Sequence, residues 1–399
     1  MGAIEGGVVG VLTKRMFDGV VDDSILDWSV ASLAAAQGFA SISSFLWAAF
    51  SHGRHKIRFI TALKIACVIL VGAVSFVPQS PLGLALILFC VIGTRVCYTG
   101  IVTLRTTVWQ ANHPRASRAF VAGRIATVQA LVLAAVGFGV GEAMDLNEQA
   151  IRWVYPVAAS FGILGAWIYS KIRVEGHREI LQDERKSPQL VSFFPWKTLH
   201  LLFEDTQFAM YMACQFIFGV GNLMLTAPLV IILSEQFELT YLGEILIIST
   251  IPILMIPLST LFWAKLLRRM HVLSFRSIHS WFFVVSSICI GVSIATHSVA
   301  GLWVGAAIRG IGFGGGVLAW NLGHQDYAPV EQSARYMGLH VTLTGIRGLL
   351  APAFGMALYS ILMSKGYQAG PLVFYVGAML SAIGGIGFIL LAKARLSSN

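Results

Sequence analysis

Apolar stretches long enough to cross a membrane alternate with short polar ones along almost the whole chain. A membrane-spanning α-helix needs about 20 mainly apolar residues. The segments that meet this length lie at roughly 28–50, 59–77, 82–108, 119–141, 151–170, 205–233, 240–263, 274–296, 299–322, 336–363 and 370–392. A twelfth, residues 1–12 (MGAIEGGVVGVL), is apolar but too short to span. The pattern predicts an all-α integral membrane protein with about twelve transmembrane helices, the first of them truncated.

Composition agrees with a membrane protein and excludes most soluble classes. Of 399 residues, 56% are hydrophobic and only 12% are charged, against about 25% charged in soluble proteins. The net charge of +9 comes from cations in short loops, which is typical of membrane topology rather than nucleic-acid binding. The cysteines lie inside predicted segments without a CxxC pair, so we expect no disulfide, metal or other cofactor.

The loops predict the orientation, because Lys and Arg gather on the cytoplasmic side of a membrane. Alternate loops differ strongly in these residues, and the long polar stretch 171–204 and the C-terminus lie on the cation-rich side. We therefore expect both to be cytoplasmic, in the inner (plasma) membrane of a bacterium. The cations on that side are Arg54, Lys56, Arg58, Arg115, Arg118, those of the linker, Lys265, Arg268, Arg269, Arg276, Arg335, Lys393 and Arg395.

Landmarks recur at an offset of 214 to 216 residues, which indicates an internal repeat. They are Trp47 and Phe59 with Trp263 and Phe275, Pro114 and Gly123 with Pro329 and Gly338, and Arg95 with Arg309. We predict an N-terminal half at 1–170, a cytoplasmic linker at 171–204 and a C-terminal half at 205–399, each half with six helices. The repeat places the start of the first helix before Met1, so we expect that helix to be incomplete; the alternative is a short or re-entrant segment.

The two six-helix halves and the basic central loop resemble the major facilitator superfamily of secondary transporters. Gly53, Arg54 and Lys56 match the end of that family's motif between helices 2 and 3, G-x-x-x-D-R-x-G-R-R/K, although Phe50 replaces its Asp. Arg95 matches the first residue of R-x-x-Q-G, with Tyr98 in place of Gln. The resemblance implies a cytoplasmic gate at Gly53, Arg54 and Lys56. It also implies a central cavity lined by helices 1, 4, 7 and 10.

Three arginines lie inside apolar segments: Arg95, Arg309 and Arg347. A charge at the bilayer centre costs about 2.5–3.5 kcal/mol on insertion scales, so such residues face the protein interior or an aqueous cavity. Arg stays charged, and each could bind an anionic group of a solute. The alternative is that each holds helices together through backbone carbonyls or a polar neighbour.

Other polar residues extend this candidate site. Tyr98, Gln129 and Asn222 could contact the same solute, or form only interhelical hydrogen bonds. Glu5 is the acid that we place well inside an apolar segment, as a proton carrier or as a counter-charge for an arginine. His324 and Asp326, after the tenth segment, could form a gate contact or lie in a solvated loop.

We therefore expect a monomeric secondary active transporter in a lipid bilayer. It would move a small anionic or zwitterionic solute by alternating access, with proton coupling as one option. The alternative is a non-transporting sensor or assembly factor on the same scaffold. The sequence shows no nucleophile–base pair, metal cluster or nucleotide motif: GFGGG, residues 312–316, lacks the Lys-Ser/Thr of a phosphate-binding loop. We do not expect an enzyme.

Overall fold

The computed structural model describes residues 4, 6–51, 53–112, 115–186, 199–328, 333–366 and 371–398. Every regular element in these ranges is a helix. In the first part of the chain they are α1 (Gly6–Met16), α2 (Asp23–Ile42), α3 (Ser44–Ser51), α4 (Lys56–Ala73), η2 (Val74–Phe76), α5 (Pro81–Asn112), α6 (Arg115–Leu146), η3 (Glu148–Ala150), α7 (Ile151–Ser170) and α8 (His177–Lys186). In the second part they are α10 (Leu201–Glu204), α11 (Thr206–Leu223), α12 (Thr226–Gln236), α13 (Tyr241–Ile245), η4 (Leu246–Thr250), α14 (Ile251–Leu267), α15 (Val272–Ala295), α16 (Val299–Leu322), η5 (Gly323–Asp326), α17 (Ser333–Met363) and α18 (Leu372–Ser398).

Eleven helical stretches of the described chain are long and apolar enough to cross a membrane. They correspond one to one with the eleven segments predicted from the sequence, so the all-α membrane fold is confirmed. The helix α1 has 11 residues and is not among these spans.

Polar residues in the predicted loops fix where several helices begin. Asp22 accepts a hydrogen bond from Ser24 N at 2.9 Å at the start of α2. Asp205 accepts one from Phe208 N at 2.9 Å at the start of α11, and Ser298 one from Gly301 N at 3.2 Å at the start of α16. Each side chain satisfies a backbone N–H that the helix itself leaves without a partner.

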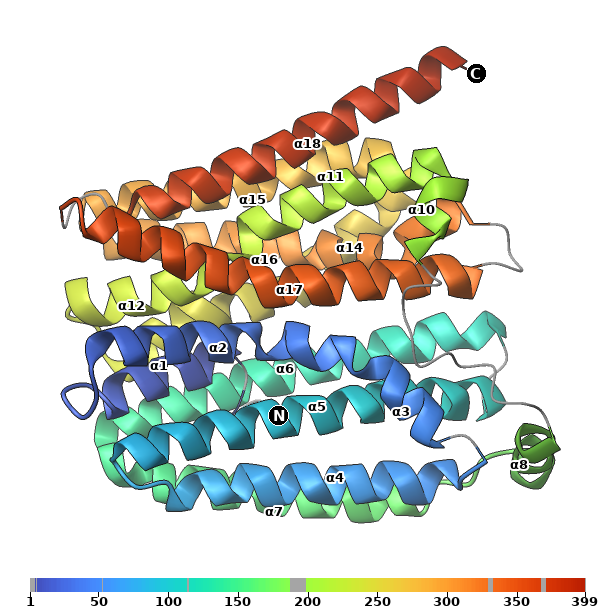
Figure 1. Ribbon diagram of the computed structural model, residues 1–399, viewed down its shortest axis with the longest axis horizontal. Helices are drawn as coiled ribbons and strands as arrows, with labels where there is room; N and C mark the ends of the chain where they lie inside the picture. Colours follow the sequence, from blue (N-terminus) through green and yellow to red (C-terminus); the bar gives the residue numbers. More distant parts are fainter. Residues whose placement is uncertain are drawn as a thin grey trace.

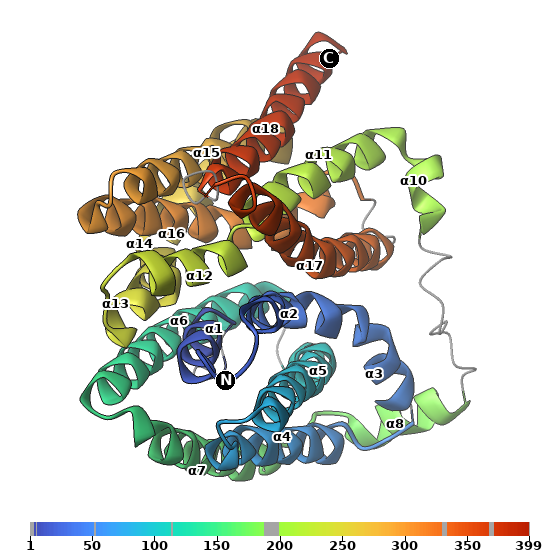
Figure 2. The same cartoon turned by 60° about the vertical axis from the view of Figure 1, so that its left-hand side comes forward.

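The helices form two layers (Figure 1): α1 to α7, the first half, lie below α11 to α18, the second half. Figure 2 shows the same separation from another side. α8 and α10 lie at one end of the bundle, which we call the linker end. The opposite end, which carries the turns between α1 and α2 and between α12 and α13, we call the distal end.

Ring contacts agree with the repeat. Trp47 and Phe59 meet edge to face, with ring centroids 6.3 Å apart. Their predicted counterparts, Trp263 and Phe275, also meet edge to face, at 5.5 Å. Each pair therefore joins two successive membrane helices at the linker end of its own half. The limits of the halves at 1–170 and 205–399 remain a prediction.

Three clusters of buried apolar side chains fill the described structure, and they are distributed unequally. The largest, the shared core, includes Leu12 and Val30 of the first half with Val230 and Ile245 of the second. A second cluster, around Trp263, belongs to the second half, and a third belongs to the first half. Both smaller clusters lie toward the linker end. The halves thus share one core at the distal end and have separate cores at the linker end.

Two membrane spans of the second half are interrupted near a proline. The span 206–236 breaks between α11 and α12, and Pro228 lies in the first turn of α12. The π-helical turn η4 precedes α14, where Pro252 is the second residue. Proline lacks an N–H, so it is tolerated in a first helical turn, where that group has no intrahelical partner.

Candidate functional site

Arg347, on α17, is buried between helices of the second half and is only 7% exposed. Its Nη1 donates to the carbonyl oxygen of Gln215 on α11 at 2.6 Å, and its Nη2 to Thr344 Oγ1 at 3.4 Å. Its Nε has no hydrogen-bond partner among the described residues. A side chain at Gly219 would collide with the guanidinium group, so the glycine leaves room for it. The oxygens of the described residues to which Arg347 donates are both neutral.

A second arginine, Arg276 on α15, lies near Arg347 and is 2% exposed. Its Nη1 lies 3.3 Å from His279 Nδ1, and His279 Nε2 lies 2.7 Å from the carbonyl oxygen of Gly312. His340 is also fully buried, within electrostatic reach of both arginines. We call Arg276 and Arg347 the cationic cluster; His279 and His340 border it. No carboxylate of the described residues forms an ion pair with either arginine.

Arg309 and Asn222, both predicted from the sequence, lie together in the second half. Arg309 Nη2 donates to Thr226 Oγ1 at 3.2 Å and to the carbonyl oxygen of Asn222 at 3.4 Å. Its guanidinium carbon lies 5.4 Å from the centroid of the Phe313 ring. These contacts bridge α16 to the break between α11 and α12.

Arg95, on α5, is the arginine of the first half that was predicted to lie in the interior, and it is half-buried. Its Nη2 donates to the carbonyl oxygen of Ile4 at 2.8 Å, and its Nη1 to Gln37 Oε1 at 3.3 Å. One turn further along, Tyr98 Oη accepts a hydrogen bond from Gln129 Nε2 on α6 at 3.2 Å. The predicted site residues thus fall into three groups, around Arg95, Arg309 and Arg347. Glu5 lies outside the described residues.

The predicted gating residues of the first half contact the linker and their own loop. Gly53 has φ of 65°, a conformation that favours glycine, and its carbonyl accepts a hydrogen bond from Arg185 Nε of α8 at 3.3 Å. Lys56 Nζ donates to the carbonyl oxygen of Ser51 at 2.7 Å, and Arg54 lies over the Phe59 ring at 5.9 Å.

The predicted gating pair of the second half contacts α15. Asp326 accepts a hydrogen bond from Val272 N at 2.6 Å and lies 3.8 Å from His271 Nε2. His324 is 4% exposed, so it is buried rather than solvated. A gating role for either residue remains a prediction.

Sequence reasoning missed the acid Glu244. It lies near the start of the apolar segment 240–263 and is fully buried, so Glu5 is not the sole candidate for an interior carboxylate. Glu244 pairs with Arg15 of α1. A carboxylate followed by nine residues without a charge (ILIISTIPI) was the available signal.

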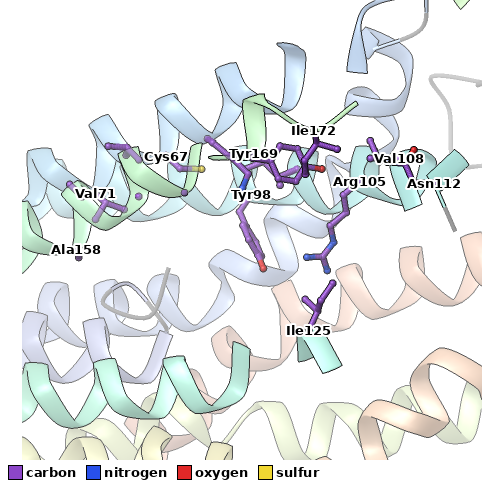
Figure 3. Close-up of a pocket in the computed structure, with 16 residues that line it drawn as sticks. Cys67, Val71, Tyr98, Arg105, Val108, Asn112, Ile125, Ala158, Tyr169 and Ile172 are labelled. Atoms are coloured by element: carbon purple, nitrogen blue, oxygen red, sulfur yellow. The ribbon is translucent and has the colours of Figure 1, made fainter. Parts of the chain in front are cut away.

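A sizeable cavity of the described structure lies within the first half rather than between the halves. It has a volume of about 540 Å³ and is bordered by α4, α5 and α7, with Ile125 of α6. Tyr98 and Arg105 extend across it toward the helix that carries Ile125 (Figure 3). On the α4 side, Lys64 Nζ lies 4.1 Å from the centroid of the Tyr169 ring. The cavity is therefore mainly apolar with two cations on its wall.

The repeat relates this cavity to α11. At the repeat offset of 215 residues, Gly162, which lines the cavity, corresponds to Gly377 in the second half. A Cβ atom on Gly377 would lie only 2.7 Å from the carbonyl oxygen of Gly221 in α11. The cavity thus stands, in the first half, at the position that α11 occupies in the second. Tyr98 is a predicted site residue that lines this cavity, whereas Arg95, Arg309 and Arg347 are not among its lining residues. The solute site at the interior arginines stays a prediction.

Eleven membrane spans in two packed halves, with arginines inside them, define a polytopic helical membrane protein. A family model described as Major Facilitator Superfamily matches residues 132–352, more than half of the chain. The chain therefore belongs to the major facilitator superfamily.

Individual relatives share the fold at low sequence identity. The nucleoside transporter NupG has a TM-score of 0.67 and 13% identity, covering 98% of this chain and 97% of its own. A D-xylose-proton symporter has a TM-score of 0.72 and 12% identity, covering 97% and 94%. The MFS-type transporter gkaD of Penicillium citrinum is 30% identical over 101 residues, which are 25% of this chain and only 16% of that protein.

Proposed function

We propose that this protein is a secondary active transporter that moves a small anionic or zwitterionic solute by alternating access. Its two halves rock about a site formed by interior arginines. The observation that carries the proposal is Arg347, which is buried beside Arg276 and meets only neutral oxygens.

Two permanent cations in a low-dielectric interior repel one another and lose their hydration. Hydrogen bonds to carbonyl and hydroxyl oxygens offset part of this cost but leave the charge uncompensated. A carboxylate or phosphate group of a solute would supply the missing negative charge, with a planar fork of donors to receive it. An anionic group is thus the ligand that the cationic cluster would stabilise most.

The distribution of the cores supports rocking of the halves. The halves share a core at the distal end and have separate cores at the linker end. A rigid-body rotation could therefore separate the halves at the linker end while each keeps its own core, whereas separation at the distal end would expose the shared core. Relatives of this fold are named as a nucleoside transporter and a xylose-proton symporter, and both names describe carriers of small solutes.

The remaining parts of the proposal follow the sequence analysis. Arg95, Arg309, Tyr98, Gln129 and Asn222 contribute further solute contacts. Glu5 carries a coupling proton, and Gly53, Arg54, Lys56, His324 and Asp326 control the gate at the linker end. That end faces the cytoplasm of a bacterium, the protein acts as a monomer, and it catalyses no covalent reaction.

The test is thermal unfolding of the purified protein in detergent with a panel of anionic, zwitterionic, cationic and neutral metabolites. A solute at 100 times its Kd should raise the free energy of unfolding by about 2.7 kcal/mol. We expect anions or zwitterions to do so, Arg347→Ala to abolish the effect, and Arg347→Lys to retain part of it. Arg178→Ala, which removes an exposed arginine of α8, is the matched control.

Stabilisation by cations or neutral solutes alone would overturn the anion preference. It would favour a solute site formed by acidic residues instead. A solute that stabilises the protein should also cross the membrane of proteoliposomes that contain it. Binding without flux would instead favour the sensor or assembly factor on the same scaffold.

A further inference from the structure

At the distal end, a buried ion pair joins the two halves. Arg15, in the last turn of α1, donates from Nε to Glu244 Oε1 of α13 at 2.9 Å, and its Nη2 contacts the same oxygen. Nη2 also reaches the carbonyl oxygen of Leu239, and the guanidinium carbon lies 4.5 Å from the centroid of the Tyr241 ring. Arg15 is thus held wholly by the second half in these contacts.

The positive charge that compensates the carboxylate of Glu244 comes from Arg15 of the first half. The side chain of Glu244 is fully buried, whereas that of Arg15 is 24% exposed. Within the part of the chain that the structure describes, Glu244 Oε2 has no hydrogen-bond partner. Because a buried charge without a counter-charge is costly, the pair stabilises the arrangement in which the halves meet here.

Two neighbouring contacts cross between the halves at the same end. Lys14 Nζ lies 2.6 Å from Glu235 Oε1 of α12 and 2.8 Å from Asp27 Oδ1 of α2, and its side chain is 4% exposed. Asp145, at the end of α6, accepts hydrogen bonds from Tyr241 N at 2.6 Å and Leu242 N at 3.0 Å. A side chain of the first half thus caps α13 of the second half.

Glycines on α6 allow this approach. A Cβ atom on Gly141 would lie 2.7 Å from Leu242 Cα, and one on Gly137 would lie 2.8 Å from Thr250 Oγ1. Residues 137, 141 and 145 are four apart and share one face of α6. The face that carries Asp145 to the end of α13 is therefore the face that packs closely on the second half.

We propose that Arg15 and Glu244 form a latch that holds the distal end closed, so that the pair sets which side of the membrane the solute site opens to. Arg15 and Glu244 are positioning residues, since neither touches the interior arginines. The role of the latch in transport rests on the proposed function. Its effect on conformation does not, because it can be measured without a solute.

The physical argument is one of differential stabilisation. A contact shifts an equilibrium between two conformations only if it is stronger in one of them. Arg15 and Glu244 are paired and desolvated when the distal end is closed, and both are hydrated when it opens. Removing either charge therefore weakens the closed conformation alone, and the population moves toward the distal-open one.

The test uses Val230, which is only 1% exposed. It lies at the interface of the halves, because a Cβ atom on Gly10 of α1 would be 3.5 Å from Val230 Cγ2. Val230→Cys is labelled with N-ethylmaleimide in detergent, and mass spectrometry measures the rate at each cysteine. We expect Glu244→Gln and Arg15→Gln each to raise the rate at position 230 about tenfold or more, which needs only about 1.4 kcal/mol. The double variant should add little to either single one, because the pair acts as a unit.

Two controls make the outcome decisive. Glu238→Gln removes the charge of an exposed acid at the same end and should leave the rate unchanged. Native Cys90, buried within the first half, should stay protected unless the protein unfolds. Rates at position 230 that match those of Glu238→Gln would overturn the latch. Faster labelling of a protein that moves no solute would keep the latch and overturn the proposed function.

Discussion

At the scale of single residues, a pair of histidines links the helix α8 to the loop before α4. The rings of His55 and His177 lie 4.1 Å apart, and His55 Nδ1 accepts a hydrogen bond from Arg58 N at the start of α4. Partial burial, together with the neighbouring His177 and Arg58, lowers the pKa of His55. The neutral ring is therefore the form that the folded arrangement favours.

This pairing predicts a response to acid. A group whose pKa is lowered on folding contributes stability above its unfolded pKa, about 6.5 for histidine, and loses that contribution as the pH falls below it. We expect backbone amides of α8 to exchange hydrogen with solvent faster, relative to the intrinsic rate, at pH 5.5 than at pH 7.5. His177→Phe keeps a ring but carries no charge, so it should reduce the difference. An unchanged difference would show that the contact between the two histidine rings is not responsible.

Individual residues show how far sequence reasoning reaches. The interior position of Arg309 and Arg347 follows from their apolar surroundings, and the structure buries both. Arg276 was counted as a loop cation, yet α15 begins at Val272, so Arg276 lies one turn inside the helix and is buried. Arg15 and Glu244 are 229 residues apart, and a pairing at that separation depends on how the halves pack, which no local pattern encodes.

At the scale of elements, two glycines of α6 look alike in the sequence but differ in what they pack against. Gly139 has nothing within 4 Å of where its Cβ would lie, whereas Gly141 packs on Leu242. The sequence displays the stretch GFGVG, but only the packed structure shows which glycine meets another helix.

These two positions provide a matched pair of variants. We expect Gly141→Val to lower the free energy of unfolding by about 1–3 kcal/mol, the usual cost of overpacking. Gly139→Val should cost less, because it introduces the same side chain into open space. Thermal unfolding in detergent compares the two, and equal destabilisation would contradict a close contact between α6 and α13.

At the scale of the whole molecule, the sequence predicted the class of fold and the positions of the spans. Hydropathy alone is enough for this prediction. In a lipid bilayer each span must form all its backbone hydrogen bonds within one helix, and apolar side chains must cover that helix. The repeat also suggested two similar halves. The closed distal end could not be foreseen, since alternative arrangements of the halves bury the same spans.

Orientation is a property of the whole molecule that remains to be measured. Glu175→Cys lies at the linker end and Asp18→Cys in the turn after α1 at the distal end, and both positions are exposed. In intact cells, a membrane-impermeant maleimide should label position 18 and spare position 175 until the membrane is permeabilised. Labelling of position 175 alone would reverse the predicted topology.

The shared core gives the conformational cycle a thermal signature. If the halves part at the distal end, apolar side chains such as Leu12, Val30 and Val230 gain contact with water. Hydration of apolar surface raises the heat capacity, so the closed and open forms differ in heat capacity as well as in energy. The free-energy difference between the two forms then changes non-linearly with temperature. The preferred side of access therefore depends on the temperature at which the cell lives.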